Sequence, residues 1–107
     1  MMQEISIAQL QEMLECGAHL VDVRESEEQP GDILDFPGIK HWPLSRFGLY
    51  KTEISQQYPT VFYCSTGMRS AIAAEMAENW TPQALFSLKG GVVHEVKEKQ
   101  RQQQDIR

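Results

Sequence analysis

The sequence has no apolar run long enough to span a membrane and no signal-peptide pattern in its first ten residues. Its two cysteines are too few for a disulfide framework, and without a targeting segment we expect free thiols in a reducing compartment. The net charge of −5 does not favour a surface that binds nucleic acid or an anionic membrane. We therefore expect a cytoplasmic protein with no nucleic-acid or membrane partner.

Several sequence patterns of common metal and cofactor sites are also missing. His and Cys residues do not cluster with metal-ligand spacing, no GxGxxG follows a predicted strand, and there is no P-loop lysine. The sequence therefore predicts no metal and no bound cofactor. With 107 residues, 41% of them hydrophobic, and no internal repeat, the chain has the size and composition of one compact domain.

The most informative stretch of the chain joins a β-type run at residues 61–63 to an Ala-rich run at residues 71–80. The first predicts a strand and the second predicts a helix. A loop that leads from a strand into a helix directs backbone N–H groups towards one point, where the helix N-terminus adds partial positive charge. Cys64 begins this loop, so we expect its pKa to lie below about 8.5 and its thiolate to be a nucleophile.

Other residues of the loop have separate predicted roles. Gly67 lets the backbone approach an anion closely, where a Cβ would clash. Arg69 supplies a permanent positive charge, either for an anionic substrate or for a carboxylate that braces the loop. Ser70 is a candidate cap of the following helix. On the residues alone, an equally good interpretation of Cys64 is a small core residue at a strand end.

Seven consecutive residues resemble the Cys-x-x-Gly-x-Arg-Ser active-site loop of rhodanese domains: Cys64, Ser65, Thr66, Gly67, Met68, Arg69 and Ser70. Residues 20–25, 36–44 and 88–92 resemble three other segments of that family, in the same order along the chain. The resemblance implies an α/β rhodanese-like fold, with a small central, mostly parallel sheet flanked by helices on both faces. It places a rhodanese-like domain at residues 1–97, followed by a polar tail at 98–107 that we expect to be frayed or disordered.

The resemblance also implies a sulfurtransferase. Cys64 would take a sulfane sulfur from a small anionic donor, thiosulfate or a persulfide, and pass it as a persulfide to a thiol, a protein or cyanide. Five residues would form the substrate-binding loop: Ser65, Thr66, Gly67, Met68 and Arg69. Two alternatives stay open, a non-catalytic binding module and a Cys-dependent phosphatase. Related phosphatases have five residues between the cysteine and the arginine, whereas this loop has four.

Asp22 and Arg24 follow a predicted buried strand at residues 19–23 and match the Asp-x-Arg strand end of rhodanese domains. Because sites in open α/β sheets form beyond the carboxyl ends of strands, we expect both residues near the Cys64 loop. Asp22 is the candidate carboxylate that braces Arg69. The other thiol, Cys16, lies near the predicted end of a helix, and we expect it to have no catalytic role.

The remaining segments predict strands at residues 3–5, 39–42 and 84–88 and a helix at 45–57. Ser6 and Gln9 form a predicted capping box for a further helix, which Gly17 ends. Two family features are missing, the histidine that often precedes the Pro-Gly pair and the aromatic residue that often follows the Gly-Gly pair. Glu95 stands in place of that aromatic residue.

Overall fold

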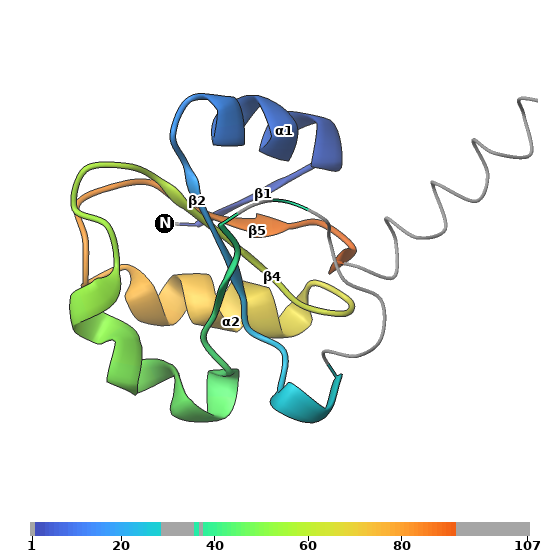
Figure 1. The fold of residues 1–107 in the computed structure, drawn as a ribbon, viewed down its shortest axis with the longest axis vertical. Helices are drawn as coiled ribbons and strands as arrows, with labels where there is room; N and C mark the ends of the chain where they lie inside the picture. Colours follow the sequence, from blue (N-terminus) through green and yellow to red (C-terminus); the bar gives the residue numbers. More distant parts are fainter. Residues whose placement is uncertain (1, 29–35, 37, 92–107) are drawn as a thin grey trace, which may run out of the picture.

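A five-stranded sheet forms the centre of the molecule in the computed structural model, which describes residues 2–28, 36 and 38–91 (Figure 1). The strands lie in the order β1-β5-β4-β2-β3, and every neighbouring pair is parallel. Their bounds are β1 Gln3–Ile5, β2 His19–Asp22, β3 Lys40–His41, β4 Thr60–Tyr63 and β5 Leu85–Leu88. All five strands were predicted from the sequence within two residues, and the sheet is parallel throughout. Glu95 and the predicted tail at 98–107 lie outside the described residues.

Helical segments cover both faces of the sheet, as the α/β prediction required. They are α1 Ile7–Glu15, the short 3-10 turn η1 Ser26–Glu28, the 3-10 segment η2 Leu44–Glu53 and α2 Met68–Ala77. In Figure 1, α1 lies above the sheet, and α2 and η2 lie below it. None of the helices within the described residues has the length and apolar composition needed to cross a membrane.

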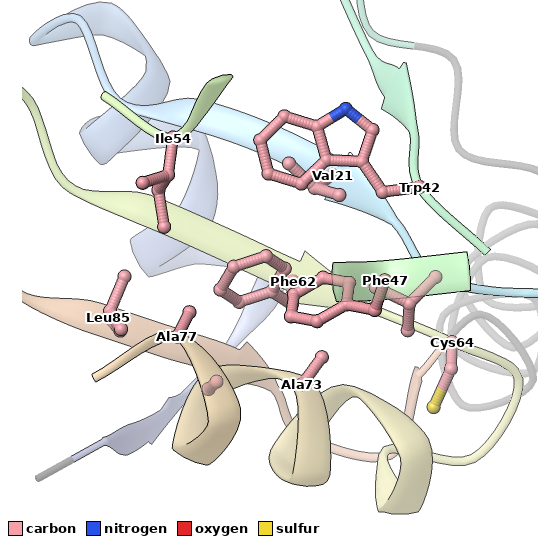
Figure 2. Close-up of a cluster of buried hydrophobic side chains, with 11 residues drawn as sticks. Val21, Trp42, Phe47, Ile54, Phe62, Cys64, Ala73, Ala77 and Leu85 are labelled. Carbon is pink, nitrogen blue, oxygen red and sulfur yellow. The ribbon is translucent and has the colours of Figure 1, made fainter. Parts of the chain in front are cut away.

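The alternation of side chains along the strands creates a core on each face of the sheet. Leu20, Val61 and Tyr63 pack with Leu10 of α1 on one face. Val21, Phe62 and Cys64 belong to the opposite core, which includes the small side chains of α2 and the aromatic residues of η2. Figure 2 shows Cys64 at one end of this second core, with its sulfur beside the first turn of α2.

The capping box of α1 is confirmed. The Ser6 hydroxyl accepts a hydrogen bond from the Gln9 N–H at 3.2 Å, and the Gln9 side chain accepts one from the Ser6 N–H at 2.8 Å. Gly17 follows the helix with a φ of 100°, a conformation that glycine adopts without steric cost. Local sequence chemistry is therefore sufficient to define both ends of α1.

The two remaining helical predictions were wrong in extent. Residues 45–57 were predicted as a regular helix, but η2 is a 3-10 segment with a break in its helical geometry at Arg46. Phe47 is its one fully buried side chain, so a regular α-helix would gain little additional packing here. Helix α2 begins at Met68 rather than at residue 71, because Gly67 adopts a φ of 96° and ends the loop directly before it.

Candidate active site

The site lies at the carboxyl edge of the sheet, where parallel strands present the segments that follow them. Cys64 comes directly after the central strand β4. The Asp22 to Glu28 segment follows the neighbouring β2, and Gly90 and Gly91 follow β5 on the other side. Three segments that are distant in sequence therefore meet at the Cys64 loop.

The Cys64 sulfur is fully buried and surrounded by hydrogen-bond donors. The N–H groups of Gly67 and Ser70 donate to Sγ at 3.1 and 3.3 Å, and the Ser70 hydroxyl oxygen lies 3.5 Å from it. Burial opposes ionisation, but hydrogen bonds from the Ser70 hydroxyl and from the N–H groups of Ser70, Gly67 and Thr66 outweigh it and lower the pKa of Cys64. The loop therefore favours a thiolate, as the sequence predicted.

Two glycines allow the loop to pack closely against the turn that follows β5. A Cβ on Gly67 would lie 3.2 Å from the Gly90 nitrogen and 3.3 Å from the Leu88 oxygen. A Cβ on Gly91 would come within 2.4 Å of the Cys64 carbonyl oxygen, which is closer than any real contact allows. The turn at Gly90 and Gly91 therefore packs directly against the Cys64 loop. The positive φ of Gly67 is needed for the backbone conformation of this loop.

The prediction that Ser70 caps α2 was wrong. Gly67 occupies the N-cap position, and it has no side chain that could cap the helix. Ser70 lies within the first turn and is fully buried, so its hydroxyl turns inward. The hydroxyl oxygen lies 3.2 Å from the Gly67 carbonyl and 2.6 Å from the hydroxyl of Ser87 on β5. Ser70 is therefore a hydrogen-bond partner of the Cys64 sulfur and does not cap α2.

The carboxylate that braces Arg69 is Glu28 and not Asp22. The two guanidinium nitrogens of Arg69 donate to the two carboxylate oxygens of Glu28 at 2.5 and 2.7 Å. Ser65 also donates to Glu28, at 3.2 Å. The hydrogen bond from Arg69 is the main reason why the pKa of Glu28 falls to about 2. Glu28 therefore ties the turn η1 to the Cys64 loop.

Asp22 and Arg24 form a separate, buried ion pair. Arg24 Nη2 donates to Asp22 Oδ2 at 3.1 Å, and the Arg24 N–H donates to Asp22 Oδ1 at 2.9 Å. Arg24 also reaches the Glu28 carbonyl at 3.5 Å. Burial, together with the charge of Asp22, raises the pKa of the neighbouring Tyr63. Arg24 therefore contacts η1 next to the loop, but the carboxylate that pairs with Arg69 is Glu28.

A family model described as "Rhodanese-like domain" matches residues 6–95, which is most of the chain. The chain belongs to the rhodanese-like family.

Solved structures of rhodanese-related proteins have the same fold. A rhodanese-related protein from Thermoplasma volcanium aligns with a TM-score of 0.77 and 22% identity, over 90% of this chain and 92% of that protein. A rhodanese homolog from Thermus thermophilus aligns with a TM-score of 0.68 and 26% identity, over 83% of this chain and 95% of that protein. These alignments confirm the predicted rhodanese-like α/β fold.

A curated relative is the chloroplastic Rhodanese-like/PpiC domain-containing protein 12 of Arabidopsis thaliana, which is 30% identical over 79 residues. The match covers 70% of this chain and 26% of the Arabidopsis protein. The chain therefore spans about a quarter of the length of this relative.

The other predicted site residues of this rhodanese-like domain form the rim of the site. Ser65 is half-buried, whereas Thr66 and Met68 are exposed. The second thiol, Cys16, is exposed at the end of α1 and precedes the amino end of β2, so it lies towards the opposite edge of the sheet. Within residues 2–28, 36 and 38–91, no group of three His, Cys, Asp or Glu side chains is arranged to hold a metal ion.

Sequence reasoning missed two residues of the rhodanese-like site, Glu28 and Ser87. Glu28 belongs to an acidic stretch that contains Glu25 and Glu27 as well, and no spacing rule distinguishes the carboxylate that reaches Arg69. Ser87 is a polar residue between the apolar Phe86 and Leu88 on β5, and it is fully buried. A polar side chain in a buried strand needs a hydrogen-bond partner, which is the only signal that could have identified it.

Proposed function

We propose that this rhodanese-like protein is a sulfurtransferase that moves a sulfane sulfur through a persulfide on Cys64. The observation that carries the proposal is the set of donors around the buried sulfur, two N–H groups within 3.3 Å and a hydroxyl within 3.5 Å. Such donors stabilise a thiolate before the reaction and the negative charge that develops on sulfur during it. A cysteine with only a packing role would need none of them.

In the first half-reaction, the Cys64 thiolate attacks the outer sulfur of the donor. A new sulfur–sulfur bond forms, the bond between the outer sulfur and the rest of the donor breaks, and its electron pair leaves with the donor. In the second half-reaction, an acceptor thiolate or cyanide attacks the outer sulfur of the Cys64 persulfide and restores the thiolate. The loop from Ser65 to Arg69 surrounds the transferred sulfur, and Arg69 also lies close enough to the thiolate to interact with its charge.

Loop length favours sulfur transfer over the phosphatase alternative. Four residues separate Cys64 from Arg69, and the last of them, Met68, is already the first residue of α2. The Arg69 guanidinium is occupied by Glu28, so it is not directed at a phosphoryl group above the sulfur. A loop one residue shorter forms a tighter cradle, which fits one additional sulfur atom better than a tetrahedral phosphoryl group.

The proposal is tested by intact-mass spectrometry after incubation with thiosulfate or, separately, with a low-molecular-weight persulfide. We expect the mass of one sulfur atom to be gained with at least one donor and lost again on addition of cyanide or dithiothreitol. The Cys64→Ser variant should gain nothing, because a hydroxyl is too weakly acidic to act as the nucleophile. The matched Cys16→Ser variant should behave as the unmodified protein. No gain with either donor, or a gain that depends on Cys16, would contradict the proposal.

A further inference from the structure

The positive charge at the mouth of the Cys64 loop is neutralised by carboxylates. Arg69 forms a bidentate ion pair with Glu28, with both guanidinium nitrogens within 2.7 Å of carboxylate oxygens. Arg24, the other arginine of this region, is paired with the buried Asp22. A bidentate carboxylate uses the edge of a guanidinium group that would otherwise bind an oxyanion. An incoming anion that approaches either arginine would therefore also meet a carboxylate.

Among the described residues, the charged side chains that interact with Arg69 carry an excess of negative charge. Arg24 and the buried Asp22 neutralise each other, and Glu28 already neutralises Arg69. Glu25 also lies close enough to Arg69 for their charges to interact. An approaching dianion would therefore meet a mouth that is negative on balance, and its approach would be opposed.

The helix that follows the loop carries exposed apolar side chains. Met68, the first residue of α2, is 74% exposed, and Ile72 and Met76 follow at intervals of four residues along the helix, 49% and 45% exposed. Residues four apart on a helix lie on one face, so these side chains form a continuous apolar stripe that starts at the loop. A carbon-bearing group that leaves the sulfur site can rest on this stripe, whereas a sulfonate group gains nothing from it.

We propose that Glu28 is a specificity-determining residue that selects organic persulfides over thiosulfate as the sulfur donor. The inference rests on the proposed sulfurtransferase function. The Cys64 thiolate attacks the outer sulfur of R–S–SH, the bond between the two donor sulfurs breaks, and the electron pair leaves on R–S⁻ while the proton stays on the transferred sulfur. With thiosulfate, the same step would release sulfite, a dianion, beside Glu28. The persulfide route releases a single negative charge and a carbon-bearing group.

The experiment compares two donors, thiosulfate and 2-hydroxyethyl persulfide, which has no charge on its organic group. The second-order rate constant for formation of the Cys64 persulfide is measured by intact mass in single-turnover conditions, so no acceptor is involved. Glu28→Gln keeps the shape of the side chain but removes its charge. It should raise the rate constant with thiosulfate, relative to the rate constant with the persulfide, by about tenfold. For each donor, the rate constant of the variant is divided by that of the unmodified protein, which cancels the intrinsic reactivity of the donor.

Glu27→Gln is the matched control. It removes the same charge from an exposed neighbour in the same turn, while the ion pair between Glu28 and Arg69 stays in place. It should raise the rate constant with thiosulfate clearly less than Glu28→Gln does. An equal effect of the two variants would assign donor selection to overall charge and overturn the role of Glu28. Equal loss with both donors in Glu28→Gln would show that Glu28 only braces the loop, and it would also overturn the proposal.

A measurement on the unmodified protein covers the case in which Glu28→Gln does not fold. Repulsion between a dianion and a negative mouth is screened by salt, so the rate constant with thiosulfate should rise with ionic strength and that with the persulfide should rise less. A thiosulfate rate constant that falls with salt would mean that the mouth attracts dianions, and the proposal would be wrong. If Cys64 gains sulfur from neither donor at any ionic strength, the sulfurtransferase function itself fails, which is a distinguishable result.

Discussion

The hydroxyl oxygens of Ser70 and Ser87 lie 2.6 Å apart inside the contact between α2 and β5, where both side chains are fully buried. Ser70 has one proton and three possible acceptors, namely the Cys64 sulfur, the Gly67 carbonyl and the Ser87 hydroxyl. When Ser87 donates to Ser70, the Ser70 proton is available for the sulfur. When Cys64 is a neutral thiol, its own S–H can donate to Ser70 and the direction reverses. The two serines therefore respond to the charge of Cys64.

Replacing Ser87 by Ala should raise the pKa of the Cys64 thiol, because the Ser70 hydroxyl loses the donor that directs its proton towards the sulfur. The loss of a buried hydrogen bond should also lower the free energy of unfolding by about 1–2 kcal/mol. The pH dependence of Cys64 alkylation, measured in a Cys16→Ser background, tests the first effect. Ser70→Ala should shift the same profile further, and an unchanged profile in Ser87→Ala would show that Ser70 binds the sulfur without help.

The ion pair between Glu28 and Arg69 should be visible in a double-mutant cycle. Both side chains are about one-third exposed, at 35% and 32%, so solvent weakens their attraction. We expect a coupling free energy of about 0.5–1 kcal/mol between Glu28→Ala and Arg69→Ala in urea unfolding. Asp22→Asn combined with Arg69→Ala is the control, and it should be additive within about 0.5 kcal/mol. Coupling in the Asp22 cycle but not in the Glu28 cycle would reverse the assignment.

Glu28 also predicts how stability depends on pH. Its pKa in the folded protein is about 2, below its ordinary value of 4.5. A group with a lowered folded pKa stabilises the folded state above the unfolded pKa and loses this effect as the pH falls through the folded pKa. The stability difference between the unmodified protein and Glu28→Gln should therefore be full above pH 4.5 and disappear towards pH 2. Chemical unfolding at a series of pH values measures it, and a constant difference would contradict the ion pair.

Gly91 should tolerate no side chain. A Cβ there would lie 2.4 Å from the Cys64 oxygen and 2.5 Å from the Ser65 oxygen, and both atoms belong to backbone that cannot move without distorting the loop. Gly91→Ala should lower the free energy of unfolding by about 2 kcal/mol or more and reduce sulfur transfer. Gly48→Ala is the matched control, since nothing lies within 4 Å of a Cβ there, and it should change stability by less than about 0.5 kcal/mol.

The length of the loop predicts no useful hydrolysis of an aryl phosphate. Inserting one glycine between Thr66 and Gly67 would give five residues between Cys64 and Arg69, as in the related phosphatases. This insertion should weaken persulfide formation and improve binding of phosphate or arsenate, measured as protection of Cys64 from alkylation. Steady phosphatase turnover by the unmodified protein that is lost in Cys64→Ser would show that loop length does not decide the reaction.

Much of the architecture could be predicted from the sequence because it depends on local chemistry. The strands and the ends of α1 follow from apolar runs, a capping box and a glycine, all of which act over a few residues. Cys64 at the end of a strand and before a helix was enough to predict a thiolate surrounded by N–H groups. The extent of η2 was not predictable, because its geometry depends on how Phe47 fits between Phe62 and Trp80 and not on its own periodicity.

The partners of the site residues were decided only by the tertiary structure. Glu28 and Arg69 are 41 positions apart, and Ser70 and Ser87 are 17 apart, on elements that the order of the strands brings together. Asp22 ends β2 with its side chain buried, so it pairs with Arg24 two residues away, while the turn η1 carries Glu28 over the loop to Arg69. Sequence alone determined that a cation and a cysteine share this edge of the sheet. Which carboxylate neutralises the cation depended on the path of the chain after β2, and local propensity does not encode that path.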